Sequence, residues 1–249
     1  MELTGEQEFI IEIATADFES TRKAVLGKAD RIELCADLGQ GGTTPSFGTI
    51  KQCREHFSTA LFPIIRPRGG DFLYSPEEFS IIKKEVLLCR ELGCDGIVTG
   101  LLSRDGSVDR KRMDIIMNLA YPMEVTFHRA FDRSRDPFEA METLIEIGCQ
   151  RILTSGQKTT APEGLELIAR LVQAANGRIV IMPGSGVRKE NILELARKTG
   201  ASEFHSSLRT RAASQMDFVH PSFAGSEESY SHPVVDQEAV IELRKALNS

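Results

Sequence analysis

The chain has 249 residues, of which 41% are hydrophobic and 27% are charged, so it can bury a sizeable core without help from disulfides. This composition excludes a miniprotein and an intrinsically disordered chain. Thirty Lys and Arg against 36 Asp and Glu give a net charge of −6, which offers no overall positive field to attract nucleic acid or an anionic membrane.

The sequence predicts a cytoplasmic location. No apolar run approaches the roughly 18 residues of a membrane-spanning helix, and the start of the chain lacks the basic and apolar regions of a signal peptide. The five cysteines are an odd number without a CxxC pair, which does not suggest a disulfide framework. We therefore expect free thiols, no membrane partner and no nucleic-acid partner.

A short β-rich apolar run, a turn and an amphipathic helical stretch alternate along the whole sequence. The eight predicted strands are Phe9–Ile13, Arg31–Leu34, Leu61–Ile65, Asp95–Val98, Glu124–Phe127, Arg151–Thr154, Ile179–Met182 and Glu203–His205. Helical patterns between them include Asp17–Leu26, Pro76–Leu92, Pro137–Ile147, Ala161–Ala175, Arg188–Lys198 and Asp236–Leu247. Eight βα units in about 250 residues predict an α/β fold, a TIM (β/α)8 barrel, as a single domain over residues 1–249.

The segment Thr210–Pro233 interrupts the alternation after the eighth strand. It is rich in Ser, His, Glu and Pro, which predicts a long loop. Such a loop could cover the barrel mouth, form an interface or simply connect two elements in solvent.

The parity of the strands predicts a functional site. Alternate strand residues face a barrel's interior, and catalytic groups lie at the carboxyl ends of the strands. The residues predicted to gather at this mouth are Glu12, Glu33, Cys35, Arg66, Arg68, Thr99, His128 and His205. Burying several ionisable groups together is costly unless they pair, so the cluster is either functional or a closed ion-pair network.

Two later turns suggest an anion site. Thr154, Ser155 and Gly156 follow the sixth strand, and Gly184, Ser185 and Gly186 follow the seventh. Small residues let backbone N–H groups approach an anion, and phosphate sites in this fold are often built from its last loops. The alternative is that both turns are ordinary tight βα connections.

The sequence resembles the CutC copper-homeostasis family. The motifs are RIELC (31–35), GGTTPS (41–46), IRPRGGDF (65–72), VTG (98–100), TFHRAFD (126–132), LTSG (153–156) and EFHSS (203–207), and the match runs from the first strand to the final helix. The resemblance implies a cytoplasmic, often oligomeric TIM barrel that handles copper or binds copper(I). Some members carry a cysteine at the position of Ala14, so this chain retains only Cys35 as a mouth thiol.

Three functional hypotheses remain open. The resemblance implies a copper-homeostasis protein, a homo-oligomer with Cys35 as the copper(I) ligand. The mouth chemistry favours a lyase- or isomerase-like enzyme for a small anionic or phosphorylated substrate. In that hypothesis Glu12 or Glu33 is the base, His128 the acid or electrophile, and Arg66 and Arg68 clamp the anion beside the Thr154–Gly156 and Gly184–Gly186 turns. The third hypothesis is a non-catalytic oligomeric scaffold.

Overall fold

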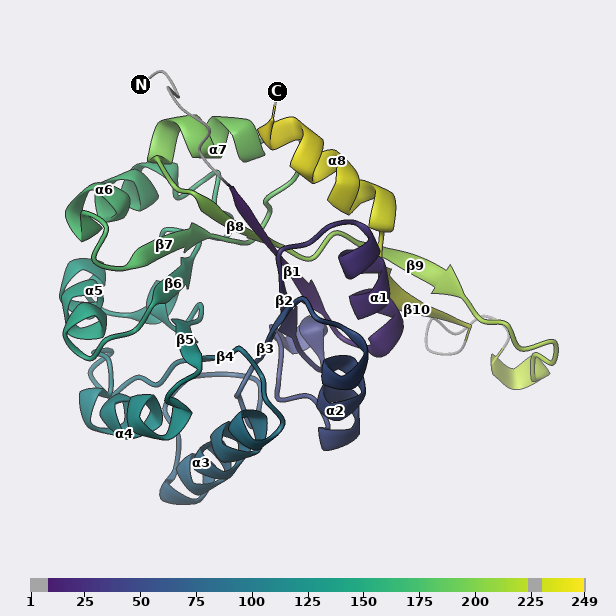
Figure 1. The fold of residues 1–249 in the computed structure, drawn as a ribbon, viewed down its shortest axis with the longest axis horizontal. Coiled ribbons are helices and arrows are strands. Elements are labelled where there is room, and N and C mark those ends of the chain that lie inside the picture. The colour runs from purple at the N-terminus through teal and green to yellow at the C-terminus, as the bar shows by residue number, and fades with distance from the viewer. Residues whose placement is uncertain (1–8, 224–229, 249) are drawn as a thin grey trace.

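The computed structural model describes residues 9–223 and 230–248. Its first eight strands form a ring with the helices outside it, which confirms the predicted TIM barrel (Figure 1). These strands are β1 (Ile10–Thr15), β2 (Arg31–Leu34), β3 (Ala60–Pro63), β4 (Gly96–Thr99), β5 (Glu124–Phe127), β6 (Arg151–Thr154), β7 (Val180–Pro183) and β8 (Glu203–Ser206). Each of them overlaps its predicted strand.

The ring consists of two four-stranded parallel sheets, in the orders β3-β2-β1-β8 and β4-β5-β6-β7. At one seam Ile64 bridges Val98, and the N–H of Ile65 donates to the Val98 carbonyl at 2.7 Å. At the other seam β7 lies beside β8 (Figure 1). The register pairs Glu12 with His205, which brings the first and last strands together beneath the mouth.

The outer layer consists of α1 (Phe18–Leu26), α2 (Phe47–His56), α3 (Pro76–Glu91), α4 (Arg110–Ala120), α5 (Pro137–Glu146), α6 (Leu165–Ala175), α7 (Ile192–Thr199) and α8 (Gln237–Leu247). The short 3₁₀ turns η1 (Leu38–Gln40) and η2 (Phe131–Arg133) follow β2 and β5, and η3 (Pro221–Phe223) lies between β9 and β10. Asp17, Ser75 and Asp136 cap their helices through side-chain oxygens. None of the described helices combines the length and the apolar character needed to cross a bilayer.

Two helices begin later than the sequence predicts. α6 begins at Leu165 instead of Ala161, because a separate turn precedes it, closed by the Gly164 N–H donating to the carbonyls of Thr160 and Ala161. α7 begins at Ile192 instead of Arg188, because the Asn191 side chain accepts a hydrogen bond from the Arg188 N–H and closes a separate turn. Both differences lengthen the βα loops that rim the barrel mouth.

The prediction of a long loop over Thr210–Pro233, after β8, is wrong. β9 (Arg209–Ala213) and β10 (Ser231–Val235) pair as an antiparallel hairpin, which projects away from the barrel in Figure 1. Its base is anchored because Val234 and Val235 are buried and the Val235 N–H donates to Ser20 on α1. Positions 224–229 of the predicted loop lie outside the described residues.

A buried ion-pair network lies inside the lower part of the barrel. Arg31 donates to Glu12 at 2.5 Å and to Glu203 at 2.6 Å. Arg151 donates to the same Glu203 carboxylate at 3.0 Å. The Phe62 ring contacts both guanidinium groups, at 5.2 Å from Arg31 and 5.4 Å from Arg151. These pairs compensate charges that would otherwise be costly to bury.

We expect Arg31→Met to lower the free energy of unfolding by about 3–5 kcal/mol, because it leaves Glu12 buried without its cation. Urea denaturation at pH 7 measures this loss. The control, Arg22→Met, breaks an exposed pair with Glu19 and should leave the urea midpoint almost unchanged. A loss below about 1 kcal/mol for Arg31→Met would contradict the importance of the network.

Candidate functional site

A cavity of about 200 Å³ opens above this network at the carboxyl ends of the strands. Five predicted site residues line it: Glu33, Arg66, His128, Ser185 and His205. The lining also contains Ala14, Leu38, Gly41, Ile64, Phe72, Arg129, Leu153, Ser207 and Arg209. We call this cavity the mouth pocket.

A chain of charged side chains leads from the buried network to the mouth pocket. Glu12 accepts from Arg31 on one side, and its other oxygen lies 2.7 Å from Nδ1 of His205. Nε2 of His205 lies 3.8 Å from the Glu33 carboxylate. The order Arg31, Glu12, His205, Glu33 therefore alternates in sign from the barrel centre to the pocket.

This alternation sets the protonation of the groups. Burial alone would raise the pKa of Glu12, but Arg31 and His205 lower it to about 2. Burial disfavours the His205 imidazolium, but Glu33 and Glu12 outweigh this effect and raise its pKa. Burial raises the pKa of Glu33, the carboxyl that faces the pocket. This direction of shift suits Glu33 to exchange a proton with a ligand in the mouth pocket.

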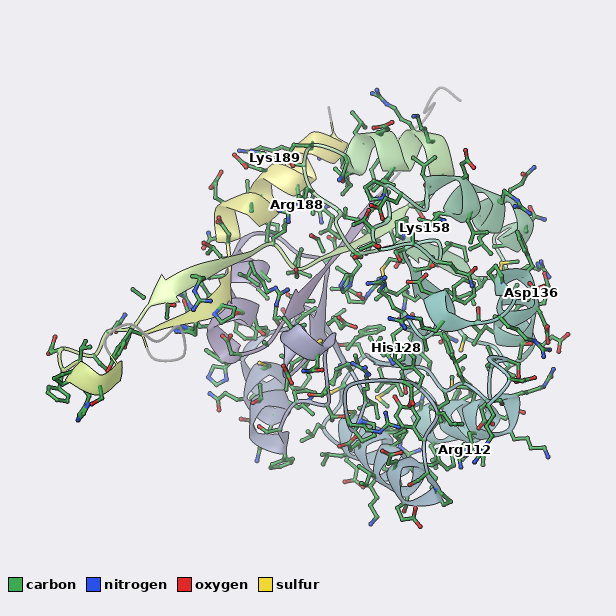
Figure 2. All side chains as sticks on the ribbon, turned by 180° about the vertical axis from the view of Figure 1, so that it is seen from behind. Arg112, His128, Asp136, Lys158, Arg188 and Lys189 are labelled. Atoms are coloured by element: carbon green, nitrogen blue, oxygen red, sulfur yellow. The ribbon has the colours of Figure 1, made fainter. Side chains whose placement is uncertain are left out.

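His128 is held neutral and presents a donor without a partner. Burial, assisted by the nearby positive charge of Arg66, lowers the His128 pKa to about 3. Nδ1 accepts from the Ala130 N–H at 3.2 Å, so the ring proton lies on Nε2, which is buried and has no hydrogen-bond partner among the described residues. Gly100 gives the ring room, since a Cβ there would lie 2.5 Å from Nδ1. Figure 2 places His128 toward the centre of the ring of strands.

Arg66 and Arg68 do not form the predicted pair of anion clamps. Arg66 is buried, and its terminal nitrogens donate to the backbone carbonyls of Gln40, Gly42 and Gly70. Only its Nε lacks a partner. The chain turns after β3, so Arg68 leaves the mouth and binds Glu78 and Asp71 beside α3. The prediction that Arg68 faces the mouth is wrong.

Thr99 and the turn after β6 also have internal partners. Thr99 donates to the Ile65 carbonyl at 3.0 Å. Asp132 accepts from the Thr154 hydroxyl and from the backbone N–H and hydroxyl of Ser155. The Thr154–Gly156 turn does bind an anion, but that anion is this protein's own carboxylate. Gly184, Ser185 and Gly186 remain beside the mouth, where Ser185 lines the pocket.

Cys35 lies deep in the wall and remains a thiol. Its sulfur lies 3.5 Å from a Glu33 carboxylate oxygen and otherwise packs against Phe62, Ile64 and Val98. Burial and then the Glu33 charge raise the Cys35 pKa well above its usual range. Copper(I) is held by thiolates and other soft ligands, so these surroundings do not fit it. No group of three His, Cys, Asp or Glu positioned for a metal occurs in residues 9–223 and 230–248.

Sequence reasoning missed two arginines of this site. Arg31 lies two residues before Glu33, so strand parity could have placed it inside the barrel. Arg209 lines the mouth pocket, and its guanidinium has no hydrogen bond or ion pair among the described residues. It follows β8 at the edge of the predicted loop, where no periodic pattern marks it.

We expect a ¹H NMR titration to give His205 a pKa above its ordinary 6.5, and Glu12→Gln to lower it. Because folding raises this pKa, the associated stabilisation is complete below about pH 6.5 and is lost as the pH rises through the folded-state pKa. Glu55→Gln, at an exposed position on α2, serves as the control. A His205 pKa that Glu12→Gln leaves unchanged would contradict the proposed chain of charges.

Known proteins resemble this chain along most of its length. A CutC-family protein of Chromobacterium violaceum is 47% identical over 242 residues, which cover 96% of this chain and 98% of that protein. The human copper homeostasis protein cutC homolog is 45% identical over 216 residues, 87% of this chain and 79% of that protein.

Solved structures agree with these relatives. The crystal structure of CutC from Streptococcus agalactiae superposes with a TM-score of 0.75 at 31% identity and covers 79% of this chain and 97% of that one. Thiamine phosphate pyrophosphorylase from Pyrococcus furiosus superposes with a TM-score of 0.59 at 15% identity, over 97% and 96% of the two chains, which shows the shared fold alone. The sequence model of the CutC family matches residues 9–210. The chain therefore belongs to the CutC family.

Proposed function

We propose that the mouth pocket is the active site of an enzyme that moves a proton next to a carbonyl group of a small anionic substrate. The observation that supports this most is the unpartnered, buried Nε2–H of His128 in a pocket also lined by Glu33. A buried donor without an acceptor costs free energy, so its presence favours a ligand oxygen as the intended partner.

The two groups have complementary roles in such a reaction. The Glu33 carboxylate takes a proton from the carbon adjacent to the carbonyl, and the electron pair of the broken C–H bond moves to the carbonyl oxygen. The neutral His128 donates its Nε2–H to that oxygen and stabilises the developing enolate. Glu33 then returns the proton to the substrate. Its raised pKa suits both directions of this transfer.

The anionic part of the substrate has a cation available. Arg209 lines the same pocket without an ion-pair partner among the described residues, unlike Arg68, whose charge is already neutralised. Guanidinium groups bind carboxylates and phosphates through two parallel hydrogen bonds. Arg209 therefore replaces Arg68 as the proposed anion clamp.

Hydrogen exchange tests the proposal. The protein is incubated in D₂O with a panel of small keto and hydroxy acids and aldehydes, each with and without a phosphate group, and ¹H NMR follows loss of the proton adjacent to the carbonyl. We expect exchange of at least one compound, and a rate reduced by about 10²–10⁴-fold in Glu33→Gln. The control is Glu55→Gln. Absence of exchange, or equal rates in wild type and Glu33→Gln, would contradict the proposal.

Copper handling is the second candidate, favoured by the names of relatives such as the human protein. In this chain the thiol concerned would be Cys35, with Ala14 where some family members offer a second sulfur. The raised Cys35 pKa and its apolar surroundings oppose thiolate ligation. Copper handling is therefore less well supported for this chain than the enzymatic function.

Anaerobic chelator competition for copper(I) separates the two candidates. We expect weak binding that is the same in wild type and in Cys35→Ala. The matched control is Cys149→Ala, another buried free cysteine away from the mouth. Tight stoichiometric binding that only Cys35→Ala abolishes would contradict our ranking and support copper as the cargo.

A further inference from the structure

A second cavity, of about 220 Å³, lies between the loops that follow β7 and β8. Its lining residues are Ser185, Gly186, Val187, Arg188, His205, Ser206, Ser207, Leu208 and Arg209. The two loops are tied together because the Ser206 hydroxyl donates to the Val187 carbonyl at 2.8 Å. The cavity walls are therefore fixed relative to each other, which suits them to bind a defined ligand.

The charges of this cavity favour an anion. Arg188 and Arg209 both line it, and neither guanidinium has an ion-pair or hydrogen-bond partner among the described residues. His205, whose pKa is raised, is the third basic group of the lining. In the part of the chain that the structure describes, no Asp or Glu lines the cavity. Figure 2 shows Arg188 in the loop between β7 and α7.

The backbone adds further donors. Within the described part of the chain, the N–H groups of Gly186, Val187 and Ser207 find no hydrogen-bond acceptor. Ser185 and Gly186 both adopt the left-handed conformation, with φ of 76° and 74°, and the Ser185 hydroxyl fixes its loop by donating to the Thr159 carbonyl. Backbone N–H groups in such turns form concave sites for anions.

The second cavity is continuous with the mouth pocket. Four residues line both cavities: Ser185, His205, Ser207 and Arg209. One ligand can therefore place its anionic end between the two loops while its other end reaches Glu33 and His128. His205 lies at the junction, where it contacts Glu12 and faces both cavities.

We infer that this cavity is a phosphate subsite and that the substrate of the mouth is a small phosphate monoester with a carbonyl group, an identification that rests on the proposed function. The donors comprise backbone N–H groups, the Ser207 hydroxyl and two guanidinium groups. They exceed the roughly four lone-pair positions of a carboxylate. The three terminal oxygens of a phosphate monoester match such a set better.

Titration with inorganic phosphate, followed by ³¹P NMR, tests the subsite without requiring turnover. We expect saturable binding that Arg188→Glu weakens at least about tenfold, a loss of about 1.4 kcal/mol. Arg197→Glu is the matched control, since it makes the same charge change at an exposed position on α7 that lines neither cavity. His128→Asn, which alters only the mouth pocket, should also leave phosphate binding unchanged.

Two results would overturn the inference: no saturable binding of phosphate to the wild type, or binding that Arg188→Glu and Arg197→Glu weaken equally. Either failure is distinct from failure of the proposed function. Hydrogen exchange of compounds without phosphate reports on the proton transfer by Glu33 and His128, whereas binding of inorganic phosphate reports on the loops after β7 and β8 without any proton transfer. Preferential exchange of the phosphorylated member of a pair would support both.

Discussion

The bond between Arg31 and Glu12 is the interaction on which the site depends. Both side chains are buried in the barrel, where each compensates a charge of the other that would be costly to bury unpaired. The guanidinium keeps Glu12 ionised, ionised Glu12 favours the His205 imidazolium, and His205 faces Glu33 at the pocket. Burial raises the pKa of the pocket-lining Glu33 carboxyl, and the His205 imidazolium that Glu12 holds in place opposes this rise.

The structure uses the barrel interior in two layers with different tasks. The lower layer contains Arg31 and Arg151, which both donate to the Glu203 carboxylate and so compensate its charge. The upper layer leaves donors that have no partner among the described residues, namely the His128 ring and the Arg209 guanidinium. Satisfied polar networks rigidify a protein, whereas unsatisfied groups mark the positions where a ligand is expected.

Strand parity predicted much of this arrangement from sequence. Glu12, Glu33, His128 and His205 alternate with apolar residues that pack against helices, so their inward direction followed from the pattern. Strand parity failed for Arg68, because the chain turns after β3 and alternate residues there no longer point to opposite faces of the sheet. Arg68 lies beyond β3 and is captured by Glu78. The turn after β6 binds the carboxylate of Asp132, which belongs to the loop after β5. No local motif reveals this contact between two loops.

The segment after β8 shows why the sequence pattern did not identify Arg209 as a site residue. Its composition suggested a loop, but cross-strand pairing and the burial of Val234 and Val235 produce a hairpin. This hairpin begins at Arg209 and so fixes the cation at the edge of both cavities. Long-range pairing of this kind depends on contacts between distant residues, and local sequence patterns do not contain that information.

The tautomer of His128 tests the central claim most directly, because the proposed chemistry requires a neutral ring with its proton on Nε2 facing the mouth. Long-range ¹H–¹⁵N correlation NMR at pH 7 distinguishes the two ring nitrogens. We expect a protonated Nε2 and an unprotonated Nδ1 that accepts a hydrogen bond from the Ala130 N–H. A ring protonated on Nδ1, or an imidazolium at pH 7, would contradict it.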